Sequence, residues 1–421
     1  MTGRDGAGPL RGAAFGRYFS AVAVGAFGTA LTAVAMPVLV VDVLGASAFE
    51  VGIVNAAQFL PYALLGLLAG VYVDRWRRQR VLVWASLGRA AALALIPLCW
   101  VLGALHLWVL VALLFLFGAF SVFGFAAGQS LLPQIVERRA LRAANARLDQ
   151  ADAAAQTAGP ALGGLLVAVI GAPLAIAVDA VTYVVDAVLV AGIRLRETAG
   201  AAPQRRSLRR EMVEGLRWTY RHRTLGPLAL STHVWFLANA AGFTVLAVFA
   251  LRTLDVGPFL YGLLFAAAGV AALAGATLAP RAGARLGSGA TITVGRAVYP
   301  LAWILIAIAP ASDDPPGVVT VVLLTAAMAL QGFAGGVENA NEMSLRQTVT
   351  PDGLLGRTSA TMRSANRTTA AVGAVLGGIA ATLLGERASL WLVVCVFVVA
   401  FGIAAFSPLR TARDDEEEDI A

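Results

Sequence analysis

Residues 158–166, AGPALGGLL, recur at residues 372–380 as VGAVLGGIA, 214 positions further along the chain. Four residues keep their places in the two copies: Gly159, Leu162, Gly163 and Gly164 correspond to Gly373, Leu376, Gly377 and Gly378. A shorter repeat, GRA at 88–90 and again at 295–297, has a nearly equal offset of 207. Each long copy lies within apolar sequence, so the pattern predicts two similar bundles of membrane helices with small-residue packing faces.

Composition also indicates a membrane protein. Hydrophobic residues make up 59% of the 421 positions and charged residues only 14%, and the mean hydropathy is +0.77. Soluble domains contain about a quarter charged residues, so this chain has too little polar surface to be one. The net charge of +7 comes from arginines in short blocks between apolar spans. That distribution favours membrane orientation over nucleic-acid binding.

Twelve apolar stretches are long enough to cross a bilayer at about 20 residues per crossing. The predicted spans are 17–43, 49–73, 81–103, 106–136, 149–170, 172–193, 227–252, 257–279, 290–310, 317–346, 358–384 and 388–408. Helices are expected because lipid offers no partners for backbone groups. The sequence thus predicts an all-α integral membrane fold with six-helix bundles at 1–193 and 227–408, a linker at 194–226 and a disordered acidic tail at 409–421.

Arginine blocks follow alternate predicted spans and are nearly absent from the other connections. The positive-inside rule then places both termini in the cytoplasm, and we expect the protein in the cytoplasmic membrane of a bacterium. In the linker, Leu208, Met212, Leu216 and Tyr220 recur every fourth residue. This spacing predicts an amphipathic helix on the inner leaflet, with a solvated tether as the alternative.

The end of the second span, GLLAGVYVDRWRRQRVL at 66–82, combines spaced glycines, an acid and several arginines. An acid where a helix leaves the membrane can cap another helix or pair with an arginine. The stretch resembles the loop 2–3 motif of the major facilitator superfamily, although Arg77 stands where many members have glycine. The matching positions are Gly70, Asp74, Arg75, Arg78 and Arg80. The resemblance implies a switch contact that alternates between two transport states; a simple arginine anchor is the alternative.

The repeated stretch itself resembles the Gly-Pro-x-x-Gly-Gly motif of drug–proton antiporters. The matching positions are Gly159, Pro160, Gly163 and Gly164. Pro160 removes a backbone donor and bends the helix, and the resemblance implies that this helix borders a central cavity and packs on the other half. Generic small-residue packing is the alternative. Further segments at 131–147, 178–189 and 345–357 resemble the macrolide- and siderophore-exporter branch, over about 15–410.

Ionisable residues inside membrane spans are functional candidates by default, because an unpaired charge there is costly. The fourth span lacks the arginine that many proton antiporters carry, so the resemblance assigns no proton route. We expect Glu342 to exchange protons, since it has polar neighbours, with Glu338 one turn away as a weaker candidate. Asp149 and Asp152 are further candidates, although acids are common in a helix's first turn, where we place them.

Two further acids and two arginines also lie inside predicted spans. Asp179 and Asp186, in the sixth span, are expected to make hydrogen bonds between helices. Arg89 and Arg296 hold matching places in the two halves. Each arginine either acts in transport or extends to the cytoplasmic interface.

Aromatic and polar residues in the central spans predict the cargo only coarsely. The candidate cavity residues are Phe120, Trp235, Asn239, Gln331 and Asn341. Many rings and few charges suit bulky amphipathic molecules. We expect a monomeric exporter of such molecules, a drug, antibiotic or siderophore, in exchange for protons and without cofactor or metal. Uptake or uniport is the alternative; a sensor or membrane enzyme is less favoured, since three scattered histidines offer no catalytic or metal spacing.

Overall fold

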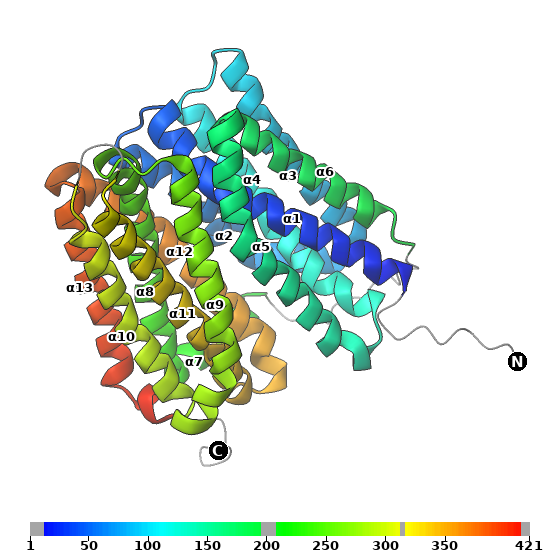
Figure 1. Cartoon of the computed structure of the whole chain (residues 1–421). Coiled ribbons are helices and arrows are strands. Elements are labelled where there is room, and N and C mark those ends of the chain that lie inside the picture. The colour runs from blue at the N-terminus through cyan, green and yellow to red at the C-terminus, as the bar shows by residue number, and fades with distance from the viewer. Residues whose placement is uncertain (1–11, 195–207, 312–315, 414–421) are drawn as a thin grey trace, which may run out of the picture.

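The computed structural model of the chain describes residues 12–194, 208–311 and 316–413, without the side chains of residues 67, 68, 70–72, 74, 75, 138, 208–212 and 352. Across these residues, twelve helices are long and apolar enough to cross a membrane. The predicted all-α membrane fold with two six-helix halves is therefore confirmed. The halves lie side by side as two tilted bundles (Figure 1).

The N-terminal half contains α1 (Ala13–Val38), the π-helical turn η1 (Leu39–Val43), α2 (Ala48–Arg75), α3 (Arg78–Val101), α4 (Leu107–Ile135), η2 (Arg138–Ala140), α5 (Leu141–Ile170) and α6 (Ala172–Ala191). The C-terminal half contains α8 (Leu225–Val248), the π-helical turn η3 (Phe249–Thr253), α9 (Pro258–Leu286), α10 (Ser288–Ala307), α11 (Val318–Thr348), α12 (Asp352–Leu384), α13 (Glu386–Ala405) and η4 (Pro408–Thr411). Between them lies α7 (Leu208–Arg221).

The repeat is visible in backbone detail. Both first helices, α1 and α8, end in a π-helical turn closed by equivalent bonds, one from Leu44 N to Leu39 O and one from Leu254 N to Phe249 O. The next residue has a left-handed backbone in both copies, Gly45 with φ of 63° and Asp255 with φ of 51°. Such a conformation is uncommon for a residue other than glycine. The two halves therefore share local geometry where their sequences differ.

The arginine-rich connections between helices that the structure describes all lie at one end of the bundle. We call this the basic end; it carries residues 76–77, 136–140, 287 and 349–351, the start of α1 and η4. The opposite end carries residues 44–47, 102–106, 254–257 and 385. At the opposite end, three hydrogen bonds among the described residues tie the halves together. Arg252 Nη2 donates to the Val41 carbonyl at 2.8 Å, Asn55 Nδ2 donates to Thr244 Oγ1 at 3.1 Å, and the Phe49 N–H donates to Thr382 Oγ1 at 3.2 Å.

Most predicted boundaries differ from the observed ones by a few residues, and two of the differences change an interpretation. Helix α5 begins at Leu141, not 149, so Asp149 and Asp152 lie more than two turns inside it and not in its first turn. The tail does not begin at 409, because Leu409 is fully buried and the Ala412 carbonyl accepts a hydrogen bond from Gly289. The acidic run from residue 414 lies outside the described residues.

Helix α7 lies within the predicted linker and packs on the C-terminal half. Its Gly215 meets α12, and Glu214 pairs with Arg357 of α12 at 2.7 Å. Tyr220 donates or accepts a hydrogen bond with His233 of α8 at 2.8 Å. Of the predicted apolar stripe, Leu216 and Tyr220 are exposed, while the side chains of 208 and 212 lie outside the described residues.

Candidate functional site

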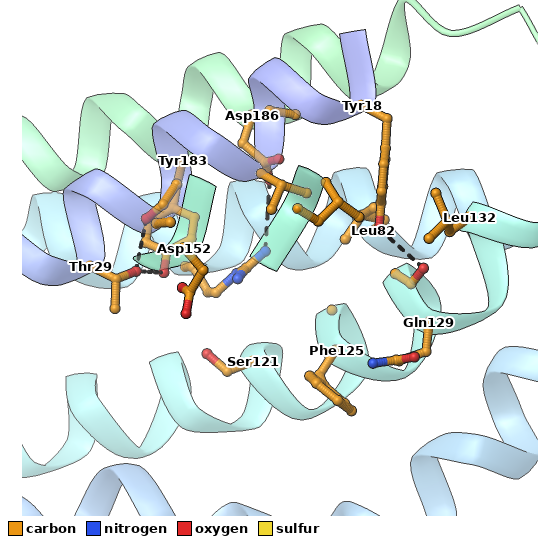
Figure 2. A pocket seen from close by; sticks show the side chains of 18 of the residues that line it. Tyr18, Thr29, Leu82, Ser121, Phe125, Gln129, Leu132, Asp152, Tyr183 and Asp186 are labelled. Carbon is orange, nitrogen blue, oxygen red and sulfur yellow. Dashed lines mark hydrogen bonds and ion pairs between the residues drawn. The ribbon is translucent and has the colours of Figure 1, made fainter. Parts of the chain in front are cut away.

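A cavity of about 760 Å³ lies among the helices of the N-terminal half. All six of these helices line it, and Arg367 of α12 adds a residue of the other half. The lining residues come from the middle of each helix and from the part nearer the basic end, so the cavity opens toward that end. Figure 2 shows Ser121 of α4 facing Asp152 across the open space.

An arginine–carboxylate pair lines this cavity. Arg89 Nη2 of α3 lies 3.8 Å from Asp186 Oδ2 of α6, and Ser86 bonds both groups. The Arg89 guanidinium also lies 4.4 Å from the ring centroid of Tyr183. Arg89 therefore does not extend to the interface, and Asp186, which we expected to be only structural, faces the cavity. Sequence reasoning missed this pair because its members are far apart along the chain.

The three other candidate acids of α5 and α6 divide into two kinds. Asp149 and Asp152 line the cavity from α5, where their side chains are exposed to it. Asp179, in contrast, is only 1% exposed and accepts hydrogen bonds from Thr32 at 2.5 Å and from Thr182 at 3.0 Å. It ties α6 to α1, which is the structural role expected for it.

A second charged centre is buried in the C-terminal half. Arg296 is 2% exposed, and its Nη2 lies 2.8 Å from Glu338 Oε1 and 3.4 Å from Glu342 Oε2. It also donates to Thr232 Oγ1 at 2.9 Å and lies over the Trp235 ring at 5.5 Å. The interface alternative for Arg296 is thus wrong as well. Both carboxylates are paired with the Arg296 side chain, and neither acid is among the residues that line the cavity.

The matching arginines of the repeat have matching surroundings. Arg89 and Arg296 each bind carboxylate and lie over an aromatic ring, but the acid comes from α6 in one half and from α11 in the other. A buried histidine, His233, lies in the C-terminal half and bonds Asn366 Oδ1 through Nδ1 at 2.6 Å. The sequence contains no spacing that singles His233 out.

The five residues that we expected in the cavity lie elsewhere. Phe120 packs on Gly88 and faces a lateral groove beside Trp84; Trp235 is edge-on to Tyr299 in an aromatic cluster. Gln331 is buried near Met328, Asn341 donates to the carbonyls of Ala279 and Val337, and Asn239 is partly buried. Hydropathy identifies a span but not the face that each residue takes. The cavity rings are instead Phe59, Tyr62, Phe117, Phe125, Tyr18 and Tyr183.

The repeated glycines pack α5 against two different helices. A methyl group built on Gly159 would lie 2.4 Å from the Ala30 side chain, and one on Gly163 would lie 2.9 Å from the Leu31 carbonyl, both in α1. A methyl on Gly164 would lie 2.6 Å from the Pro258 carbonyl of the other half. Pro160 also faces the other half, because its carbonyl lies 2.3 Å from a methyl built on Gly262 of α9. Only Gly164 and Pro160 of the motif therefore contact the other half.

The second copy repeats this arrangement. Gly373 and Gly377 meet Leu237 and Ala241 of α8, in their own half, and Gly378 meets Ala48 at the start of α2. The contact from Gly164 to the start of α9 thus has a twin from Gly378 to the start of α2. Together they seal the end opposite the cavity mouth.

The loop motif between α2 and α3 is described only in part. The side chains of Asp74 and Arg75, and the surroundings of Gly70, lie outside the described residues. Arg78 is partly buried and Arg80 is exposed. Sequence reasoning missed Gln79, whose Nε2 donates to the carbonyls of Val190 and Ile193 at 2.8 and 2.7 Å and so caps the end of α6.

Comparisons with known proteins agree with this architecture. The sequence profile described as transmembrane secretion effector matches residues 5–420. The multidrug efflux pump Tap of Mycobacterium tuberculosis is 34% identical over 240 residues, 54% of this chain and 56% of that protein. The chain thus spans about half the length of this curated relative. An uncharacterised major facilitator-type transporter of Sinorhizobium fredii is 28% identical over 333 residues, 79% of this chain and 80% of that protein.

Among solved structures, a bacterial homologue of the iron transporter ferroportin in its inward-facing state superposes with a TM-score of 0.71. It is 17% identical, and the alignment covers 93% of this chain and 98% of that one. This likeness shows the fold. The relatives and the fold are those of transporters and not of enzymes.

Proposed function

This chain belongs to the transmembrane secretion effector family of the major facilitator superfamily, and on that premise we propose that it exports amphipathic small molecules by alternating access. The observation that carries the proposal is the cavity of about 760 Å³, which combines aromatic rings with charged groups and opens at one end while the halves are sealed at the other. A cavity of this size accommodates a drug-sized molecule. The multidrug efflux pump Tap is a relative over half its length, which supports export.

Orientation follows from the arginines. If the basic end faces the cytoplasm, as the positive-inside rule requires, the cavity opens inward in this structure. Cargo then enters from the cytoplasm or the inner leaflet and leaves after the seal at Gly164 and Gly378 opens. We accordingly place the protein in the cytoplasmic membrane of a bacterium with both termini inside.

Protons are the proposed exchange ion. Asp149 and Asp152 contact the cavity directly, whereas Glu338 and Glu342 act through Arg296, which binds both. Protonating Glu342 removes one of the two negative charges that pair with Arg296. The ion pair between Arg296 and Glu338, at 2.8 Å, remains. Glu342, with a side chain 16% exposed against 5% for Glu338, is the more accessible of the two. We retain it as the principal candidate.

Asp74 is proposed as the switch of the α2–α3 loop on sequence grounds. Charge-assisted contacts are worth about 1.5–3 kcal/mol, so losing one shifts a two-state equilibrium about tenfold or more. We expect Asp74→Asn to insert normally and to export poorly. Full export by this variant would reduce the loop to a topology anchor.

Transport is tested in inside-out membrane vesicles that contain the protein, with an imposed pH gradient, acid inside. Fluorescein and rhodamine 123, two amphipathic dyes of opposite charge, serve as separate probes. We expect gradient-dependent accumulation of at least one of them, lost when the gradient is collapsed. Vesicles without the protein control for leakage, and Arg410→Gln, an exposed arginine in η4, controls for mutation as such. Equilibration without accumulation, unchanged by the gradient, would instead support uniport.

A further inference from the structure

Two arginines of α12 cross from the C-terminal half onto aromatic rings of the N-terminal half. The Arg367 guanidinium lies 5.3 Å from the Phe59 ring centroid and 5.5 Å from that of Tyr62. One turn earlier, the Arg363 guanidinium lies 3.9 Å from the Phe125 ring centroid. All three rings line the cavity, and so does Arg367. Where α12 meets the cavity, the Arg367 guanidinium therefore lies in the lining beside these rings, and the Arg363 guanidinium lies behind the Phe125 ring.

Among the described residues, no carboxylate offsets the positive charge of this wall. Arg89 and Arg296 each have a carboxylate within ion-pair distance, but within the described part of the chain no carboxylate lies within 4.0 Å of Arg363 or Arg367. The two arginines are one turn apart on the same helix, where like charges repel. Arg346 of α11 adds to the same positive field.

The remaining charged groups of the cavity do not neutralise this wall. Asp186 is already paired with Arg89. Asp149 and Asp152 belong to α5, which packs on α9. The cavity thus has an acidic wall on α5 and a basic wall on α12, and an anionic group in it is drawn to the basic wall.

We propose that Arg367 and Arg363 bind an anionic group of the cargo, so that the exported class is amphipathic molecules bearing a carboxylate, sulfonate or phosphate. This inference rests on the proposed export function and specifies its substrate. A planar guanidinium donates two parallel hydrogen bonds to such an oxyanion. The rings of Phe59, Tyr62 and Phe125 then contact the apolar body beside it. Arg367 is the principal group because it lines the cavity itself.

A matched pair of dyes tests the charge preference directly. Fluorescein and rhodamine 123 share a ring system but carry opposite charge, and fluorescence polarisation measures their affinity for the purified full-length protein in nanodiscs of neutral lipid. We expect wild-type protein to bind fluorescein more tightly than rhodamine 123. Arg367→Gln should weaken fluorescein binding about tenfold or more and leave rhodamine 123 binding within about twofold, with a smaller loss in Arg363→Gln.

Controls separate charge from packing. Arg367→Lys retains the charge but not the planar fork, so its fluorescein affinity should be intermediate; Arg410→Gln should match the wild type. Three results overturn the inference: fluorescein binding no tighter than rhodamine 123 binding in the wild type, unchanged fluorescein binding in Arg367→Gln, or equal weakening of both dyes. No gradient or transport enters this measurement. Tight fluorescein binding without export in vesicles would contradict the proposed function and leave the binding site standing.

Discussion

Alanine at Gly164 is expected to open the end of the molecule that is sealed here. Its methyl group would lie 2.6 Å from the Pro258 carbonyl and 3.1 Å from Phe259 Cα. Ordinary contacts are about 3.5 Å, and both opposing atoms are backbone, which cannot rotate away. The start of α9 must therefore move away from the C-terminal turns of α5. Because these helices belong to different halves, the two halves separate at this end.

The steric clash of the new methyl group destabilises only the conformation in which this end is closed. Overpacking of this kind costs about 1–3 kcal/mol. In the alternate state the halves are apart at this end, so the penalty disappears and the equilibrium shifts about 5- to 150-fold toward that state. Gly378→Ala, whose methyl would lie 2.5 Å from the Ala48 carbonyl, should act the same way. The double variant should combine both shifts because the two contacts are independent.

Gly163→Ala is the matched control. Its methyl would lie 2.9 Å from the Leu31 carbonyl, which belongs to the same half. That clash persists in both states, so it should lower the melting temperature without changing the ratio of states. The comparison separates loosening of the seal from general loss of packing.

The assay uses a cysteine-free background with one reporter, Thr244→Cys. Thr244 is fully buried at the seal and bonds Asn55 across the halves. In intact cells, a membrane-impermeant maleimide should label this cysteine faster in Gly164→Ala than in the parent, in proportion to the shift. Equal labelling rates in the parent, Gly164→Ala and the double variant would refute the idea that these glycines make the seal. Equal acceleration by Gly163→Ala would refute its state dependence.

Three further predictions concern charged groups. Arg252→Gln removes the charge-assisted bond to the Val41 carbonyl across the halves, so labelling of the seal reporter should rise about tenfold. Glu342→Gln should abolish export driven by a pH gradient in reconstituted vesicles while cargo-for-cargo exchange continues; undiminished gradient-driven transport would transfer the coupling role to the acids of α5. Arg296→Gln strands Glu338 as a buried unpaired acid, at a cost of about 3–5 kcal/mol, and adding Glu338→Gln should recover much of the lost melting temperature; no recovery would mean that the pair is not what stabilises this centre.

The sequence alone determined the architecture. Each crossing depends on a local sum of hydropathy over about 20 residues, and lipid forces such a segment to be helical. The offset of the glycine repeat then showed that the bundle is duplicated. The repeat also located a close-packing face, because only residues without bulky side chains let helices approach so closely.

Only the tertiary structure decided which partner each residue meets. Gly163 and Gly164 are adjacent in sequence but point about 100° apart on a helix; one therefore packs within its own half and the other seals the two halves together. Phe117 and Phe120, three residues apart on α4, point about 60° apart; Phe117 lines the cavity, while Phe120 faces a lateral groove. Arg89 finds Asp186 and Arg296 finds Glu338 across nearly 100 and just over 40 residues of chain, respectively. A hydropathy profile contains no information about how a helix is rotated or tilted. Rotation and tilt decide which residues meet in each of these contacts.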